Sequence, residues 1–413
     1  MQQQREHEHA TAEPVDPGRS AEEQLLRDAL GDELRGELRM LSHEPYGEGA
    51  LTGFEEAGTA RAWYVDTSGK RVDSETGLVL GDPQQPQARI WLHPADPRLP
   101  ALSPASFPDA AATLMARMGV AIDRRPELLV YRPGKRAMFR MRAGARETYL
   151  KIVRPSSSAA IVHLQESLRA GGVPVPTITG WSELGIVLTE AAAGVPLTAR
   201  LDELDPELLL DSIDALRERM AAVDTGRDAR ASLASRTPWY VSRLRAALDR
   251  HARRGARLGV LLASVERSLD ALDAAAPDDA DRRTVHGDLH VGQLFIDADG
   301  SSRIAGVIDI DTAGLGDPAD DEAALMGHLV ASIALSRADP ARAAGFRRLL
   351  DASAARWLAP GRPGRARVAH RTAVHVLAHA LTPTERGDLE TAEAELALGL
   401  EILGHAGRAR GGR

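Results

Sequence analysis

The side chains best suited to chemistry in this 413-residue chain lie in two short segments. In one-letter code they are HGDLHVGQLF, from His286 to Phe295, and IDIDTAGLGDPADD, from Ile308 to Asp321. An aspartate on a loop after one strand, and another closing the next strand, would bring two carboxylates together from one β-hairpin. Phosphoryl transfer needs a carboxylate that orients the attacking hydroxyl, further oxygen ligands for Mg²⁺ and a cation on the phosphates. The two segments therefore predict that chemistry.

Lysine is the second signal, because the chain contains so little of it. Lys70, Lys135 and Lys151 are the only lysines, although lysine and arginine together number 51, and asparagine is absent. Arginine carries the same charge, but its wide planar fork does not replace a compact ammonium in a tight phosphate site. A lysine in a chain that otherwise uses arginine therefore marks a position where a compact ammonium is needed.

The two segments resemble the catalytic and metal-binding loops of the aminoglycoside-phosphotransferase and choline-kinase-like family, which has the protein-kinase fold. The resemblance extends from about Leu128 to the C-terminus. It implies that Asp288 is the catalytic base or hydroxyl-orienting group and that Asp309 binds Mg²⁺. His286 would brace the loop rather than react. The implied partners are a nucleotide, ATP or GTP, and a small molecule with an acceptor hydroxyl.

One position departs from the family pattern. Most members have Asn five residues after the catalytic Asp, where this chain has Gln293. Gln offers the same amide oxygen on a longer stem. Beyond Ala101 the only glutamines are Gln165 and Gln293, so we interpret Gln293 as a kept metal ligand. A similar Gly-Gln loop occurs in maltokinase-like sequences, and a Gly-His loop in macrolide phosphotransferases.

The resemblance also implies a set of nucleotide-binding residues. Lys151, in Tyr149–Val153, matches the lysine of the third strand that binds the phosphates, and Lys135 falls on the phosphate-covering loop. The partner of Lys151 on the following helix is Glu166 on chemical grounds, or His163 by counting back from Val173. Glu190, at the end of the strand before the hinge, completes the set.

Short apolar runs and turn residues predict the surrounding elements. Leu128–Tyr131, Ala137–Met141 and Thr148–Val153 read as an antiparallel meander, followed by a helix from about Ser158 to Ala170. The expected fold is α+β and bilobal: a small β-rich N-lobe (119–193) and a large helical C-lobe (194–413). Before them we expect a disordered tail (1–20) and an N-terminal extension (21–118).

Within the extension, leucine spacing predicts a helix over Ala21–Leu41, and the Pro- and Asp-rich stretch Gly81–Pro108 reads as a linker. In the C-lobe, Asp320 and Asp321 are expected to cap a helix over Glu322–Val330. The paired His375 and His379 are interpreted as core or boundary residues rather than zinc ligands.

A single helix is also expected over Pro238–Leu258, with six arginines and one acid. We interpret these arginines as a solvated basic face. If they lined the acceptor cleft, a neutral or anionic sugar-like acceptor would fit better than a polycationic aminoglycoside.

Composition excludes several functions. The net charge of -8 disfavours nucleic acid as a partner, and the absence of cysteine excludes disulfides and thiolate zinc sites. No apolar run reaches the length of a membrane span, and the polar start lacks the apolar core of a secretory signal, so cytoplasm is expected.

The sequence leaves three functional hypotheses. The main hypothesis is a small-molecule kinase with a sugar-like or antibiotic acceptor. The alternative is a nucleotide-binding pseudokinase with a regulatory or scaffold role. A protein kinase is disfavoured, because the loop reads His-Gly-Asp and Gly316-Asp317-Pro318 follows Asp309 almost at once. The sequence determines neither the acceptor, nor the choice between ATP and GTP, nor the oligomeric state.

Overall fold

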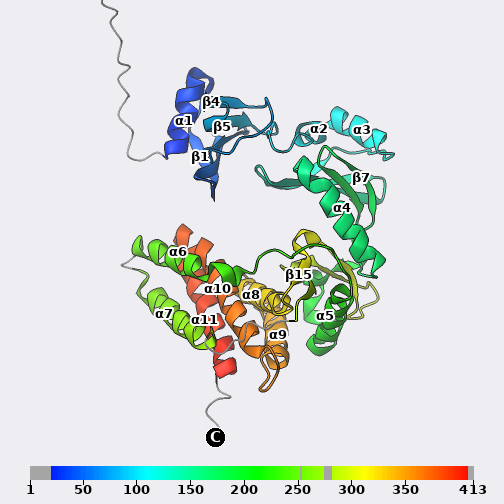
Figure 1. Cartoon of the computed structure of the whole chain (residues 1–413), viewed down its shortest axis with the longest axis vertical. Coiled ribbons are helices and arrows are strands. Elements are labelled where there is room, and N and C mark those ends of the chain that lie inside the picture. The colour runs from blue at the N-terminus through cyan, green and yellow to red at the C-terminus, as the bar shows by residue number, and fades with distance from the viewer. Residues whose placement is uncertain (1–19, 252–253, 274–280, 408–413) are drawn as a thin grey trace, which may run out of the picture. The chain divides into compact units, whose positions relative to one another are not determined.

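The computed structural model describes residues 20–251, 254–273 and 281–407 (Figure 1). The chain divides into two compact units. The first comprises Met1–Ala159 and Thr179–Thr189, and the second comprises Ala160–Ile178 and Glu190–Arg413. Each unit has hydrophobic clusters of its own. The expected tail over residues 1–20 falls almost entirely outside the described residues.

The first unit begins with a helix against an antiparallel sheet, drawn in blue in Figure 1. Leu26 of the helix and Phe54, Val65 and Ile90 of the sheet form a buried apolar cluster. The helix is α1 (Ala21–Leu30), and the sheet has the order β1-β2-β3-β5-β4 with strands β1 (Leu38–Tyr46), β2 (Gly49–Glu56), β3 (Arg61–Asp66), β4 (Leu78–Asp82) and β5 (Gln85–Leu92).

Two sequence predictions in this region are wrong. The helix expected to reach Leu41 ends at Leu30, because Gly31 takes a positive φ of 47° and Leu38 pairs with Glu56 of β2. The expected linker over Gly81–Pro108 contains strand β5, whose Ile90 is buried. Leucine spacing and proline content are local signals, and here strand pairing and burial outweigh them.

The second sheet of the first unit confirms the predicted meander. It is antiparallel where β6, β7 and β8 pair, and its apolar side packs on the short helices α2 (Leu102–Ser106) and α3 (Pro108–Arg117). The order is β6-β7-β8-β10-β9, with β6 (Glu127–Arg132), β7 (Arg136–Ala143), β8 (Arg146–Val153), β9 (Ile178–Ser182) and β10 (Ile186–Glu190). The small antiparallel β-rich lobe expected from the sequence is therefore present.

The turn between β6 and β7 is tied to the chain segment that follows β5. The carboxylate of Asp96 accepts hydrogen bonds from the Gly134 N–H (2.7 Å) and the Tyr131 hydroxyl (2.8 Å). Arg154 donates to the Gly134 carbonyl at 2.7 Å. Gly134 has φ +64°, and a Cβ there would lie 3.1 Å from Arg98 Cδ. Both backbone groups of Gly134 are thus engaged, and its position leaves little space for a side chain.

The second unit is mainly helical. Its core gathers apolar residues from almost every helix around the buried strands β13 and β14. The helices are α4 (Pro155–Ala170, which starts in the first unit), α5 (Pro206–Ala221), α6 (Thr237–Asp249), α7 (Ala256–Asp273), α8 (Ala319–Leu335), α9 (Pro340–Trp357), α10 (Arg365–Arg386) and α11 (Leu389–Gly407). The strands are β11 (Val195–Pro196), β12 (Arg283–Val285), β13 (Leu294–Ile296), β14 (Ile304–Val307) and β15 (Gly314–Gly316).

The small strands form two sheets that carry the loops of interest. One has the order β11-β13-β14, and the other pairs β12 with β15 in antiparallel fashion. No helix in the described ranges is both long and apolar enough to cross a membrane. The α+β architecture expected from the sequence is thus present.

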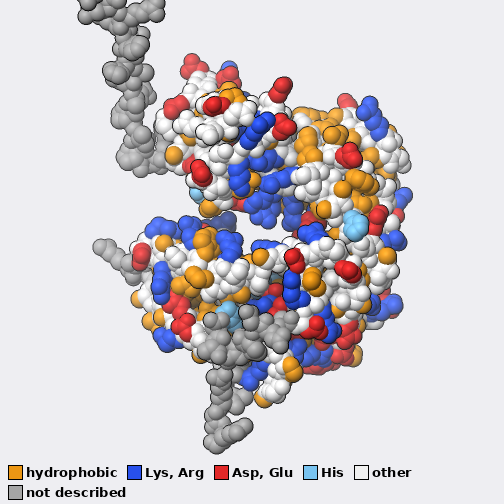
Figure 2. Space-filling view, viewed as in Figure 1, with side chains coloured by type: hydrophobic (Ala, Val, Ile, Leu, Met, Phe, Trp, Pro, Cys, Tyr) orange, Lys and Arg blue, Asp and Glu red, His pale blue; other side chains and the backbone are white. Residues whose placement is uncertain are grey.

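The predicted helix over Pro238–Leu258 is two helices, because α6 ends at Asp249 and α7 starts at Ala256. Figure 2 shows basic side chains over the region where Figure 1 places α6. Several of these arginines meet carboxylates of neighbouring helices: Arg243 pairs with Glu385, Arg245 with Glu266 at 2.7 Å, and Arg257 with Glu393 at 3.6 Å. Three of the six arginines are therefore paired, and their side chains remain exposed. Arg253 lies outside the described residues.

Asp96 tests how strongly the β6–β7 turn depends on its neighbours. Asp96→Ala removes the acceptor of three donors, the Gly134 and Arg98 N–H groups and the Tyr131 hydroxyl. We expect a loss of about 3 kcal/mol in the free energy of unfolding, because buried donors left unpaired cost about 1–3 kcal/mol each. Urea denaturation measures it. Asp82→Ala, at an exposed turn, is the control, and equal losses in both variants would contradict the prediction.

Candidate active site

The loop after β12 carries His286, Gly287 and Asp288. His286 is fully buried, whereas Asp288 keeps about a third of its side chain exposed. Gly287 has φ +79°, and a Cβ there would lie 2.7 Å from the Thr312 carbonyl oxygen. The Thr312 hydroxyl donates to the His286 carbonyl at 2.8 Å. The loop therefore packs directly on the chain that precedes β15, and glycine is required at its bend.

Asp321 holds this loop from the other side. Its carboxylate accepts hydrogen bonds from the His286 N–H and the Gly287 N–H, both at 2.8 Å. It lies in the first turn of α8 and is 2% exposed. Two consecutive backbone amides bound to one buried carboxylate fix the direction in which the chain enters Asp288.

The predicted capping role of Asp320 and Asp321 is therefore wrong. Helix α8 begins at Ala319, three residues before the predicted start. The Ala319 N–H is accepted by Asp317 at 3.0 Å. Asp320 instead accepts from the Ser232 hydroxyl at 2.6 Å and pairs with Arg371 at 2.7 Å. The acidic run does sit at a helix start, but two of its carboxylates bind other segments of the second unit.

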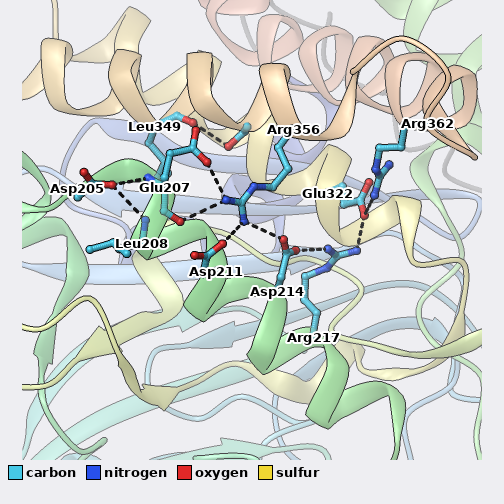
Figure 3. A network of polar contacts seen from close by, with 11 residues as sticks. Asp205, Glu207, Leu208, Asp211, Asp214, Arg217, Glu322, Leu349, Arg356 and Arg362 are labelled. Carbon is cyan, nitrogen blue, oxygen red and sulfur yellow. Dashed lines mark hydrogen bonds and ion pairs between the residues drawn. The ribbon is translucent and has the colours of Figure 1, made fainter.

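An ion-pair network holds the start of α8 (Figure 3). Glu322, next to Asp321, accepts from Arg217 and Arg362 at 2.7 Å each. Arg217, on α5, also donates to Asp214 at 2.8 Å and to the Pro318 carbonyl at 3.1 Å. Burial opposes the charge of Arg217, but Glu322 and Asp321 raise its pKa above the ordinary value. The network thus holds Asp321 in place through Glu322, the next residue of α8.

The chain after β14 carries Asp309. Pairing of β13 with β14 places Gln293 opposite Ile308, whose N–H donates to the Gln293 carbonyl at 3.0 Å. Asp309 has the left-handed backbone φ 59°, ψ 42°. His286 Nε2 lies 3.1 Å from the Ile308 carbonyl oxygen. Gln293 and Asp309 thus lie at the same end of the hairpin, and the imidazole of His286 contacts the residue before Asp309.

The two aspartates do not come from one hairpin, contrary to the sequence-based expectation. Asp288 follows β12, which pairs with β15, whereas Asp309 follows β14, which pairs with β13. Between them, Val291–Gln293 form a short 3₁₀ helix, with His290 as its N-cap. The two loops are joined instead by contacts of His286 with Ile308 and Thr312 and by the backbone hydrogen bond from Ile308 to Gln293.

The donor set at Asp309 fits Mg²⁺. Mg²⁺ binds through one or two carboxylates and takes its remaining oxygens from water and substrate phosphates. Gln293 is buried, and its amide oxygen accepts from the His290 N–H at 2.9 Å, which leaves one lone pair for a metal. Among the described residues, no group of three or more His, Cys, Asp or Glu is placed to hold a metal ion. A site with one carboxylate and one amide oxygen does not require such a group.

Two residues that the sequence analysis missed set the charge of Asp288. Arg230 Nη1 lies 3.4 Å from one carboxylate oxygen, and His328 Nε2 lies 3.6 Å from the other. Burial alone would raise the pKa of Asp288, but His328 and Arg230 lower it to about 2. Asp288 is therefore ionised at neutral pH. No sequence motif pointed to these partners, since they lie 58 and 40 positions from Asp288 along the chain.

The predicted nucleotide residues are divided between the units. In the first unit, Lys151 is buried on β8 opposite Met138, and Lys135 pairs with Glu44. In the second unit, His163 and Glu166 are both exposed on α4. The N–H of Glu190 donates to the Thr177 carbonyl at 2.9 Å. The pairing of Lys151 with either α4 residue, and the nucleotide roles of this set, stay predictions.

The family model of the phosphotransferase enzyme family matches residues 134–370, more than half of the chain. The matched range contains both loops described above. The chain belongs to this family. Membership makes it a small-molecule phosphotransferase enzyme. No curated protein sequence matches the chain.

Solved structures of aminoglycoside phosphotransferases are similar in fold. A thermostable mutant of APH(4)-Ia is 18% identical, with a TM-score of 0.45, and covers 73% of this chain and 99% of its own. APH(2'')-Ib is 14% identical, with a TM-score of 0.43, and covers 72% and 99%. APH(3'')-Id from Streptomyces rimosus is 23% identical, with a TM-score of 0.38, and covers 68% and 99%. At these scores the likeness carries no argument about the acceptor.

Asp321→Asn tests whether the buried carboxylate positions the catalytic loop. The amide keeps the size but offers one acceptor oxygen for two N–H donors. We expect kcat to fall about 10–100-fold while nucleotide affinity stays within a few-fold, since small misplacements of a reacting group cost that much. Asp320→Asn, one residue away and without contact to the loop, is the matched control. Steady-state kinetics with calorimetric nucleotide titrations decide it, and an unchanged kcat in Asp321→Asn would reject the role.

Proposed function

We propose that this phosphotransferase moves the terminal phosphoryl group of ATP, or of GTP, to a hydroxyl group of a small molecule in a reaction that requires Mg²⁺. The observation that carries the proposal is the ionised, partly exposed carboxylate of Asp288 on a loop fixed by Asp321. The carboxylate of Asp288 is 31% exposed and has acceptor sites beyond the one that Arg230 uses, so it can accept a hydrogen bond from an incoming hydroxyl. Family membership supplies the reaction class.

The low pKa of Asp288 favours orientation over proton abstraction. A carboxylate with a pKa near 2 is a weak base towards an alcohol. In a loose phosphoryl-transfer transition state the hydroxyl needs little deprotonation before the new bond forms. Asp288 would therefore hold the acceptor oxygen in line and take its proton late in the step.

Asp309 and Gln293 would hold the magnesium ion. Its charge would neutralise the phosphate oxygens when the metal is bound. The left-handed backbone at Asp309 and the contact of His286 with Ile308 fix the Asp309 main chain before any metal arrives. His286 therefore acts on the geometry of both loops and has no reacting role.

The lysines of the first unit would bind the nucleotide. Lys151 lies on β8 and is 8% exposed, so it is not an ordinary surface lysine. A compact ammonium fits between a carboxylate and phosphate groups where a guanidinium does not. Lys135 would contribute from the β6–β7 turn after release from Glu44, and Glu166 and Glu190 complete the proposed set.

A second candidate function is a nucleotide-binding pseudokinase. The observation that favours it is the hydrogen bond from the His290 N–H to the amide oxygen of Gln293. This bond uses one lone pair of the oxygen that would bind the metal. The retention of Asp288, Asp309 and Lys151 favours the enzyme. Magnesium-dependent ADP release in the presence of a panel of acceptors distinguishes the two functions.

Asp288→Ala tests the hydroxyl-orienting role. Turnover is expected to fall by about 10²–10⁴-fold, the usual contribution of such a group, while nucleotide binding survives. The measurements are ADP release and a calorimetric nucleotide titration. Asp299→Ala, at an exposed turn, serves as the control. Turnover within a few-fold of wild type would show that Asp288 has another role.

Asp309→Asn tests the metal site without a backbone penalty. Asn is among the residues that best tolerate a positive φ, so the substitution removes charge and leaves the left-handed conformation in place. We expect the nucleotide affinity of the variant to lose its dependence on Mg²⁺. Titrations with and without Mg²⁺ check it, with thermal melts to confirm folding. The assignment fails if the variant keeps the magnesium dependence of the wild type.

A further inference from the structure

Four histidines gather around the catalytic loop of the second unit. His290 lies on the loop itself, His328 on α8, and His375 and His379 one turn apart on α10. The ring centroid of His328 is 4.3 Å from that of His290, 4.5 Å from that of His379 and 6.4 Å from that of His375. Three separate segments thus bring their imidazoles to one place, with His328 at the centre.

The cluster adjoins the carboxylate that would receive the acceptor. His328 Nε2 is 3.6 Å from one oxygen of Asp288, and Arg230 contacts the other oxygen at 3.4 Å. His290, His328 and His379 are partly exposed, whereas His375 is 6% exposed and lies behind them. An acceptor hydroxyl bonded to Asp288 would lie next to Arg230 and His328, and the rings of His290 and His379 flank that of His328.

The chemistry of these groups suits hydroxyls rather than ammonium groups. A neutral imidazole offers one donor and one acceptor, and so does a sugar hydroxyl. Burial, together with the proximity of His328, lowers the pKa of His379 to about 3, so this imidazole is neutral at pH 7. The positive charge of Arg230 is paired with Asp288, and the imidazoles carry no negative charge. Apart from Asp288 itself, a polycationic acceptor would therefore find no carboxylate among these side chains to pair with its ammonium groups.

Neither a metal site nor simple core packing accounts for the four histidines. A metal site is not supported, because no suitable group of three ligands occurs among the residues that the structure describes. Core packing accounts for His375, but not for three partly exposed imidazoles beside an ionised carboxylate. The arginines of α6 do not provide an alternative acceptor surface, since Arg243 and Arg245 pair with glutamates of α10 and α7.

We propose that His290, His328 and His379, together with Arg230, form the acceptor subsite beside Asp288, and that this subsite selects a hydroxyl-rich small molecule without several ammonium groups. The assignment rests on the proposed function, because it concerns the acceptor of the same reaction. It explains why imidazoles from α8 and α10 converge on the catalytic loop.

The test combines an acceptor screen with spectroscopy of the imidazoles. The full-length protein, with Mg²⁺ and ATP, is assayed for ADP release with uncharged mono- and disaccharides and with hygromycin B, the aminoglycoside bound in one similar solved structure. Imidazole ¹⁵N spectra are then recorded with a non-hydrolysable ATP analogue and each acceptor. We expect one or more uncharged sugars, and not hygromycin B, to stimulate ADP release and to shift the resonances of His290, His328 and His379. The resonances of His43, which lies on β1 and is hydrogen-bonded to Thr52 of β2, should not shift.

Variants separate a binding role from a structural one. His328→Gln and His379→Gln are expected to raise the acceptor KM about tenfold each, the value of roughly one lost hydrogen bond, with a smaller change in kcat. His43→Gln should leave KM unchanged. Variants that lower only the melting temperature would overturn the proposal, and so would an unperturbed histidine spectrum with every uncharged acceptor, or a higher kcat/KM for hygromycin B than for any sugar.

Failure of the proposed function gives a different result. Absence of both nucleotide binding and acceptor-stimulated ADP release would reject the phosphotransferase activity itself. Turnover with hygromycin B alone would keep that activity and reject only the subsite.

Discussion

The organisation of the candidate site depends on one buried carboxylate. Asp321 accepts the N–H groups of His286 and Gly287, and so fixes the chain immediately before Asp288. Its own place is set by the start of α8, which Arg217 and Arg362 hold through Glu322. Without this carboxylate two backbone amides would lack a partner, a cost that the loop would relieve only by moving. The ion pairs on α5 and α8 thus act on the catalytic loop from a distance.

The sequence predicted what is local. His-Gly-Asp and Ile-Asp-Ile-Asp are contiguous, so their chemistry and their loops were recognisable, and the meander over residues 128–153 follows from apolar runs between turn residues. The roles of Asp321, Arg230 and His328 were not predictable in this way. Each acts on the loop through a contact between residues more than 30 positions apart, and no periodicity encodes such a contact.

Charge patterns were only a partial guide for a related reason. Arg243, Arg245 and Arg257 are exposed, as the predicted solvated basic face requires, yet each of them also pairs with a glutamate on α10, α7 or α11. The acidic run at the start of α8 looked like a set of helix caps, yet Asp320 and Asp321 bind Ser232 and the catalytic loop. The net charge of a short sequence segment counts only the residues of that segment. The electrostatic field at a surface also depends on the charged residues of the neighbouring helices.

The engagement of the β6–β7 turn has a consequence for the thermodynamics of ligand binding. Gly134 donates its N–H to Asp96, and its carbonyl accepts a hydrogen bond from Arg154. Ordering a free backbone costs about 1–2 kcal/mol per residue at 25 °C, and for this turn that entropy is lost on folding. A ligand that binds at the turn therefore meets a preformed surface, so its affinity is not reduced by a cost of ordering the loop. The contacts of Asp96 and Arg154 thus spare a ligand an entropy cost that a free turn would impose on binding.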